Sequence, residues 1–366
     1  MKKEKISSVQ FMIIVCIFSI GTTIVQIPRG LAASAKQDAW IAIIIAVFIG
    51  FFVILLLTNV SQSNSQMTFI DIMKQQFGKP IGFIASLSFI FFALHSSAAL
   101  LSYMGDFLST QILTETPTSI IQFIIIIVIS FAMKLGIESI ARSTEIFFFW
   151  ILLFLLFIFL FTSPLLQFEN MLPLMESSPK QIGKGALLYL SVTPFTLVIL
   201  MMVFPAINNS QQGKKGMLIG YALAGLIIIT FTFYTILILG PDATARNNVP
   251  TYLIAKKINL GPMFGRVEAI LAFVWIICIF YKLLFYFYAS SLGVTQLFQL
   301  KDGNSLILPL AMYCYLLSII VYPSTTYRND WDENIFVAYS LTHGFILPIV
   351  LLLTTFIRQK WKNKQS

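Results

Sequence analysis

Residues 9–28 read VQFMIIVCIFSIGTTIVQIP, an apolar stretch that is interrupted by Gly21-Thr22-Thr23 and closed by Pro28. A second stretch, residues 186–205, reads ALLYLSVTPFTLVILMMVFP and is interrupted by Ser191-Val192-Thr193-Pro194. Inside a bilayer, unwound backbone leaves N–H and C=O groups without partners, which is tolerated only where protein or a solute-filled cavity satisfies them. The two breaks occupy matching positions in the two halves of the chain, as in transporters built from inverted repeats. We therefore predict a binding site near the bilayer midplane, between two broken helices.

The composition places the chain in a membrane. Of its 366 residues, 58% are hydrophobic and 11% are charged, a balance that excludes a soluble globule and indicates a polytopic membrane protein. The apolar runs are continuous rather than alternating with period two, so helices are favoured over a β-barrel. Crossing about 30 Å of hydrocarbon takes roughly 20 helical residues. We predict spans at 9–28, 39–60, 81–106, 118–134, 143–163, 184–206, 216–240, 266–298, 305–322 and 335–357.

These spans predict an all-α fold with two related halves. We expect residues 1–366 to form a single transmembrane domain, made of five-helix repeats at 1–165 and 180–366. Basic residues cluster before the first span and after the last, which predicts both termini on the cytoplasmic side. Ala33-Ser34-Ala35 mimics a signal-peptide cleavage site, but the apolar run before it is longer than a usual signal core, so we expect the first span to be retained. The net charge of +9 is ordinary for a membrane protein and does not suggest nucleic acid.

Two connections between spans carry patterns of their own. Within residues 61–80, Phe69, Met73 and Phe77 recur at every fourth position, which predicts a short amphipathic helix on the cytoplasmic face. The outer loop 241–263 ends at Gly261-Pro262 and is either a lid helix over the outer vestibule or an ordinary connector.

The sequence predicts neither a metal site nor a cofactor. Cys16, Cys278 and Cys314 all lie inside apolar spans, where they match neither a disulfide framework nor a metal-ligand spacing. The spans also contain no His/Asp/Glu cluster and no nucleophile motif. We therefore do not expect an enzyme.

Lys282 lies deep in the apolar stretch 269–298. Burying a charged amine costs at least a few kcal/mol unless the amine is paired or neutral. Snorkelling to an interface would require the side chain to bridge well over 10 Å, at about 1.5 Å per helical residue. The alternatives are a buried partner and a neutral amine, and a charged ammonium is also placed to meet a ligand carboxylate. Tyr286, one turn away on the same face, is placed to line the same cavity.

Three further titratable residues lie in or near the spans. His95 follows Phe92 by one turn and is either an interhelical hydrogen-bonding residue or a residue facing the broken helices. Asp106 and Glu145 lie near span ends, where carboxylates reach water and are mostly structural.

Two regions of the chain resemble a known family. Ile20-Gly21-Thr22-Thr23, Ile27-Pro28-Arg29 and Gln37-Asp38-Ala39-Trp40 resemble the opening of the B subunit of bacterial spore germinant receptors. Arg266-Val267-Glu268, Trp275 and the run from Tyr286 to Gly293 resemble that family's eighth span. The resemblance implies membership of the amino acid–polyamine–organocation superfamily and a LeuT-type 5+5 inverted repeat with helices 1 and 6 broken. It also implies a larger A subunit and a lipoprotein C subunit as partners, in the inner membrane of the spore.

The resemblance implies a function that the half-helix ends support. These ends offer N–H groups to an anion and C=O groups to a cation, which matches a zwitterionic amino acid. We expect a germinant-receptor subunit that binds a small nutrient and signals to its partners; the alternative is a self-sufficient amino-acid permease, which the shared fold cannot separate. Lys282 is expected either to substitute for the cation of sodium-coupled relatives or to meet the ligand carboxylate. Thr23 departs from the superfamily's small Gly-x-Gly-like pattern, which counts against a glycine-sized or alanine-sized ligand. The residues expected to bind the ligand are Gly21, Thr22, Thr23, Phe92, Ser96, Thr193, Phe195, Thr196, Lys282 and Tyr286.

Overall fold

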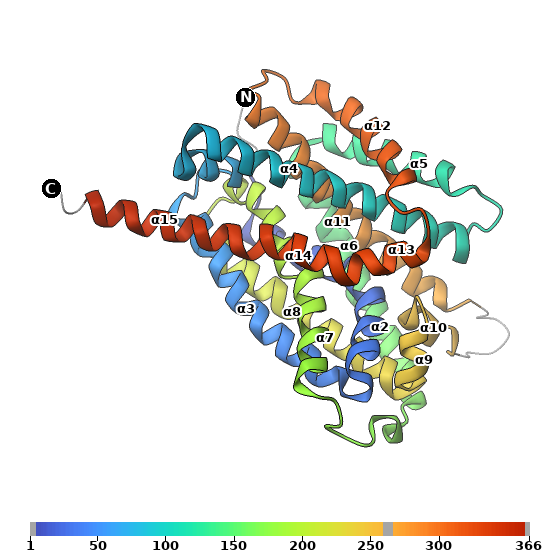
Figure 1. The fold of residues 1–366 in the computed structure, drawn as a ribbon. Coiled ribbons are helices and arrows are strands. Elements are labelled where there is room, and N and C mark those ends of the chain that lie inside the picture. The colour runs from blue at the N-terminus through green and yellow to red at the C-terminus, as the bar shows by residue number, and fades with distance from the viewer. Residues whose placement is uncertain (1–4, 259–265, 363–366) are drawn as a thin grey trace.

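The computed structural model describes residues 5–258 and 266–362, and Figure 1 shows them as a bundle of helices. The first half contains α1 (Ser8–Ile20), α2 (Thr23–Ala35), the short η1 (Lys36–Asp38), α3 (Ala39–Ser63), α4 (Phe69–Gln111), α5 (Thr118–Lys134) and α6 (Gly136–Thr162). The connector to the second half carries two 3₁₀ turns, η2 (Ser163–Leu165) and η3 (Phe168–Met171).

The second half repeats the pattern with a broken span at its start. It contains α7 (Pro179–Val192), η4 (Phe195–Met202), η5 (Phe204–Ala206), α8 (Ser210–Leu239), α9 (Pro241–Arg246), α10 (Pro250–Lys256), α11 (Glu268–Leu297) and α12 (Asn304–Ile320). The last span is a continuous rod made of α13 (Thr325–Asp330), a π-helical turn (Trp331–Ile335), α14 (Phe336–Leu341), a second π-helical turn (Thr342–Ile346) and α15 (Leu347–Lys362).

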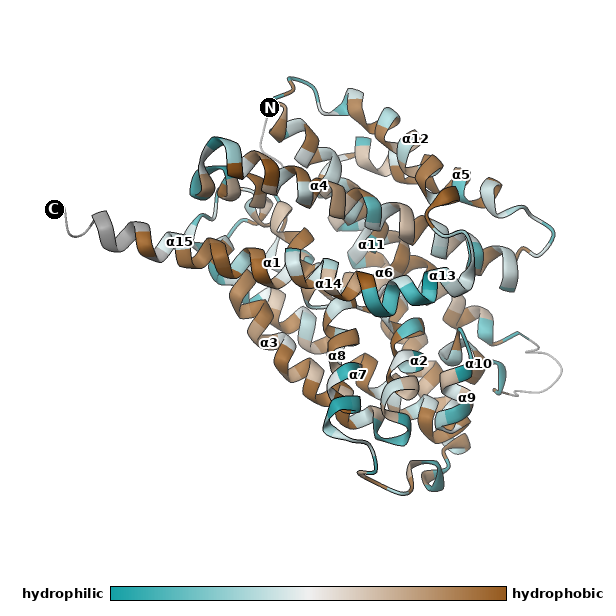
Figure 2. Ribbon diagram, in the orientation of Figure 1, coloured by the Kyte–Doolittle hydropathy of each residue, from teal (hydrophilic) through white to brown (hydrophobic). Residues whose placement is uncertain are grey.

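The lengths of these helices fit a polytopic membrane protein. Within the described residues, seven helical stretches are long and apolar enough to cross a bilayer, and α1, α5 and α12 are shorter apolar helices. Because α1 continues the stretch of α2, the elements account for the ten predicted spans. Apolar side chains of α5, α6 and α12 are exposed on the outside of the bundle, where lipid would cover them (Figure 2).

Both predicted helix breaks are confirmed. The first span unwinds at Gly21 and Thr22, between α1 and α2. The sixth unwinds at Thr193 and Pro194 and continues as the 3₁₀ helix η4, a form that rarely extends beyond a few residues. The breaks face each other, because Thr23 Oγ1 lies 2.8 Å from Thr193 Oγ1. At one end of the bundle, Ile6 pairs through its backbone with Ala206 and Asn208, so the start of α1 is also attached to the end of the sixth span.

Other connections differ from the sequence prediction. A helix does form over the predicted amphipathic segment, but it packs on the bundle, where Phe69 is buried and contacts Phe89 with ring centroids 5.0 Å apart. It joins the third span at Gly78, whose φ of 77° is available to glycine and lets the chain turn. In the outer loop 241–263, α9 and α10 are helical, whereas Gly261-Pro262 lies outside the described residues.

The last span begins ten residues earlier than predicted. It was expected at 335, whereas α13 begins at Thr325 and is capped by the Ser324 hydroxyl, which accepts the Tyr327 N–H. The extension brings Arg328, Asn329 and Asp332 against the first and third spans. Hydropathy missed this segment because four charged residues between 328 and 333 mask its helical continuity.

Candidate ligand site between the broken spans

Lys282, on α11, connects both broken spans. Its ammonium Nζ donates to the Val192 carbonyl at 2.9 Å and to Thr22 Oγ1 at 3.3 Å, and it lies 5.3 Å from the centroid of the Phe18 ring. The side chain is 2% exposed, so it does not snorkel to an interface. Lys282 therefore has buried partners, which was one of the two alternatives that the sequence left open.

The position of the ammonium follows from the polarity of the half-helices. Val192 is the last residue of α7, and helix carboxyl ends carry unpaired carbonyls and partial negative charge. A compact cation at that end is favourable. Gly21 makes room for the lysine stem, because a Cβ at position 21 would lie 2.6 Å from Lys282 Cδ.

A small cavity of about 40 Å³ adjoins this ammonium. That volume is below the usual range for small-molecule sites, so an amino acid fits only if the lining side chains move apart. The cavity is lined by Thr22, Gln26, Ser96, Ala99, Leu100, Tyr103, Val192, Thr196, Lys282, Tyr286, Tyr322, Asp332 and Phe336. It lies between the breaks of the first and sixth spans and is covered by the third, eighth and last spans.

The structure places the ten sequence-predicted residues in and around this cavity. The residues that line it are Thr22, Ser96, Thr196, Lys282 and Tyr286. The others lie behind the lining. Thr23 and Thr193 hydrogen-bond to each other, Gly21 packs on the stem of Lys282, and Phe195 packs against Phe345.

Phe92 lies one layer away from the cavity rather than in its wall. Its ring packs against Tyr286 and Phe336, which both line the cavity, and stacks on His343 with centroids 4.7 Å apart. His95 points toward the last span, with its ring 5.1 Å from Trp331, and not toward the broken helices. Glu145, on α6, accepts a hydrogen bond from Gln10 of α1 at 3.3 Å and does not line the cavity.

The main residues that sequence reasoning missed are Gln26, Tyr103 and Asp332. Gln26 is a polar residue one turn beyond the first break, a signal that was available in the sequence. Asp332 is the carboxylate that lines the cavity, and it accepts a hydrogen bond from the Tyr103 hydroxyl. Its position became apparent only with the early start of the last span.

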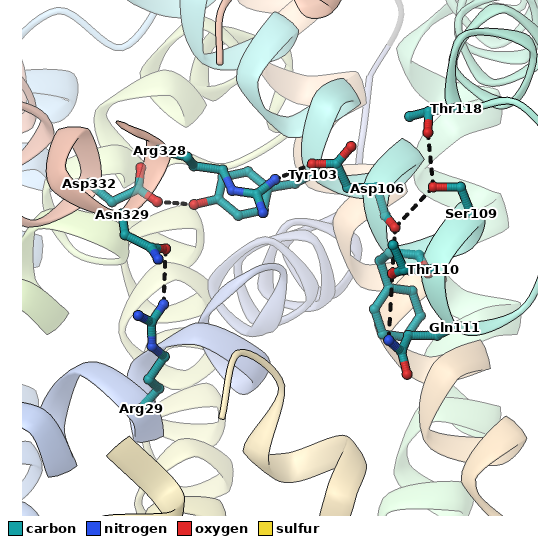
Figure 3. A network of polar contacts seen from close by, with 11 residues as sticks. Arg29, Tyr103, Asp106, Ser109, Thr110, Gln111, Thr118, Arg328, Asn329 and Asp332 are labelled. Atoms are coloured by element: carbon teal, nitrogen blue, oxygen red, sulfur yellow. Dashed lines mark hydrogen bonds and ion pairs between the residues drawn. The ribbon is translucent and has the colours of Figure 1, made fainter. Parts of the chain in front are cut away.

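A polar network formed by side chains of α2, α4 and the last span lies beside the cavity (Figure 3). Besides the contact between Tyr103 and Asp332, Arg328 pairs with Asp106, and its guanidinium lies 4.6 Å from the centroid of the Tyr103 ring. Arg29 on α2 donates to Asn329 at 2.9 Å. A second hollow of about 80 Å³ shares Gln26, Tyr103, Val192 and Asp332 with the cavity. Asp106 lines neither of these two hollows, whereas Tyr103 and Asp332 line both and stand between them. We call these contacts the closing network.

The two broken spans, the cavity between them and the helices that cover it define a membrane protein with transporter architecture. Residues 5–326 match the family model of the spore germination proteins, the spore permeases, so the chain belongs to that family. It is 26% identical to spore germination protein KB of Bacillus subtilis, over 100% of this chain and 97% of that protein. It is 23% identical to spore germination protein B2 of the same organism, over 97% of this chain and 95% of that protein.

Solved transporter structures share the fold. MhsT in complex with L-phenylalanine superposes with a TM-score of 0.69 at 13% identity, covering 97% of this chain and 99% of MhsT. Mhp1, a nucleobase-cation-symport-1 family transporter with bromovinylhydantoin bound, gives a TM-score of 0.67 at 12% identity, covering 94% of this chain and 78% of Mhp1. The predicted all-helical LeuT-type architecture is confirmed. The family and these neighbours are permease-like and not enzymes.

Proposed function

We propose that this chain is the membrane subunit of a spore germinant receptor that binds a small zwitterionic nutrient, an amino acid, in the cavity between spans 1 and 6. The observation that carries the proposal is the ammonium of Lys282 on the carboxyl end of α7, beside a small cavity between the two broken spans. Of the ten residues named from the sequence, the proposed ligand-binding residues are those that line the cavity, Thr22, Ser96, Thr196, Lys282 and Tyr286, with Gln26, Tyr103 and Asp332 added.

The two ends of the cavity suit the two charges of an amino acid. The first turn of α2, beginning at Thr23, has N–H groups without partners inside the helix, and these favour a carboxylate. Asp332 offers a carboxylate to the ligand ammonium. Lys282 already donates to Val192 and Thr22, so we assign it the place of a bound cation rather than the main contact of the ligand.

Binding is proposed to be reported to partner subunits, a larger A subunit and a lipoprotein C subunit, in the inner membrane of the spore. In this proposal both termini are cytoplasmic, and the repeats span 1–165 and 180–366. The alternative is a self-sufficient amino-acid permease, a function that the fold shared with solved transporters does not separate from a sensor.

Two measurements separate these functions. Uptake of radiolabelled amino acids into proteoliposomes containing only this chain tests the permease. The germination response of spores that carry wild type or Ala99→Phe tests the sensor, because a phenyl group at position 99 fills the cavity. A sensor gives no uptake and loses its response in Ala99→Phe, whereas robust uptake by the isolated chain would establish the permease instead.

A further inference from the structure

The connector between the two repeats, residues 163–178, presents apolar side chains to the outside of the molecule. Met175 is 76% exposed, Phe168 70%, Leu172 65% and Leu174 52%. Figure 1 shows this green segment at the lower edge of the bundle, beyond α7 and α2. It lies at the end opposite the backbone pairing of Ile6 with Ala206 and Asn208, which we call the outer face.

The connector is held in a fixed shape by the corner that joins the first and second spans. The Asp38 carboxylate is fully buried and accepts the backbone N–H groups of Met175 and Ser177, each at 2.8 Å. Gln37 Nε2 donates to the Pro173 carbonyl at 2.9 Å and to Glu176 Oε2 at 2.8 Å. These bonds hold Met175 at a φ of 60°, a conformation that residues other than glycine rarely adopt.

A rigid apolar surface is unusual for a loop that only connects two helices. Loops normally have mobile, polar tips. Large exposed apolar side chains in a pre-ordered arrangement are typical of binding surfaces, because ordering the surface in advance lowers the entropy cost of association.

The charge of the connector indicates which kind of molecule covers it. Residues 143–179 contain no Lys or Arg, while the connector carries Glu169 and Glu176. Segments that bind anionic lipid surfaces are rich in Lys and Arg. The acidic connector therefore fits a protein with an apolar socket and a basic rim better than it fits a lipid surface.

We propose that the connector, through Phe168, Leu172, Leu174 and Met175, docks a folded partner protein on the outer face. The clasp of Asp38 ties this surface directly to the end of α2, the half-helix whose first turn adjoins the ligand cavity. A displacement of α2 therefore also moves the connector and the partner protein that is bound to it. This docking surface rests on the proposed function, because a sensor needs a contact with its partner. The test of the surface uses no nutrient, so the docking proposal and the sensor proposal can fail independently of each other.

The test uses cysteine labelling. The chain's three cysteines are all 0% exposed, so Met175→Cys introduces one accessible thiol. Its labelling by a membrane-impermeant maleimide is compared in native membranes and in the purified chain in liposomes of phosphatidylethanolamine and phosphatidylglycerol. Thr114→Cys, on the exposed α4–α5 connection of the same face, is the matched control.

We expect the Met175→Cys variant to label at least tenfold more slowly in native membranes than in liposomes, whereas the Thr114→Cys variant labels equally in both. Adding Asp38→Asn or Leu172→Gln to Met175→Cys should restore fast labelling in native membranes. Equal, fast labelling of Met175→Cys in both preparations would overturn the proposal. Slow labelling of Met175→Cys in the liposomes would also overturn the proposal. Slow labelling that does not depend on protein density would indicate that lipid covers the connector. Intermolecular disulfides through the thiol at position 175 would indicate that a second copy of this chain covers it.

Discussion

Replacing Lys282 by methionine tests the assignment of its ammonium as a built-in cation. Methionine has nearly the same length and volume, so the packing against Gly21 and Phe18 is largely kept. The substitution removes the donor to Val192 O, at 2.9 Å, and to Thr22 Oγ1, at 3.3 Å. The Thr22 hydroxyl can rotate toward another partner, and the Val192 carbonyl loses its charged donor but still accepts a hydrogen bond from Thr196 Oγ1 at 3.0 Å.

Loss of a charged donor at a buried carbonyl costs about 1–3 kcal/mol. If that cost falls on the closed arrangement that the ligand requires, the ligand concentration for half-maximal response rises by about 5- to 150-fold. Thr22→Val is the matched control, because it removes only the longer of the two bonds and should shift the response by less. Lys282→Arg should also be impaired, since a planar guanidinium is larger than the space beside Gly21 allows.

The assay is the dose–response of germination for these variants, with sodium present and with sodium replaced by choline, after membrane levels of each variant have been matched. The reasoning predicts a right-shifted curve for Lys282→Met and an unchanged wild-type curve in choline. A Met variant identical to wild type would refute the role of the ammonium. A wild type that requires sodium would refute the substitute-cation assignment even if the lysine matters.

Substitutions at Gly21, Tyr103 and Asp332 test three other parts of the site. Gly21→Ala should lower the free energy of unfolding by about 1–3 kcal/mol, because the new Cβ would lie 2.6 Å from Lys282 Cδ. Gly183→Ala is the control, because nothing lies within 4 Å of a Cβ at that position, and it should not lower the free energy of unfolding. Thermal unfolding in detergent compares the two variants. Tyr103→Phe should speed both ligand association and dissociation in stopped-flow measurements, because it removes the donor to Asp332 and loosens the closing network. Ser109→Ala is the control, because the Ser109 hydroxyl pairs with Thr118 away from the cavity, and both rates should stay unchanged. Asp332→Asn should weaken the binding of an amino acid by about 1.5–3 kcal/mol, because a charge-assisted hydrogen bond is lost. It should weaken the binding of the corresponding carboxylic acid without an amino group by less. Equal losses for both ligands would show that Asp332 does not contact the ligand ammonium.

The breaks of the first and sixth spans could be read from the sequence because Gly21 and Pro194 interrupt otherwise continuous apolar runs. Lys282 was equally visible, since its distance from polar sequence excluded an interface position. Its partner was not visible. The sequence predicted the place of a cation or a contact with a ligand carboxylate, and the structure gives the Val192 carbonyl of the sixth span as the partner. A side chain's depth follows from sequence position, but its bonding direction depends on how helices far apart in the chain pack together.

The closing network and the outer clasp could not be predicted for the same reason. Asp332 and Arg328 look like ordinary span-end charges until the last span is extended to Thr325, and the π-helical turns within it have no sequence signature. Gln37-Asp38 was noticed only as part of a family resemblance. Its function depends on Met175, which is 137 residues away in the chain.

Calorimetric titration of the purified chain with a panel of amino acids, in sodium and in choline buffers, tests the central claim most directly. The account predicts that at least one amino acid binds the wild type with the same Kd in both buffers. The same amino acid should not bind Ala99→Phe, because the phenyl group fills the cavity, and it should bind the control variant Thr114→Ala normally, because position 114 is away from the cavity. Binding that is absent for every amino acid, that requires sodium, or that persists in Ala99→Phe would contradict it.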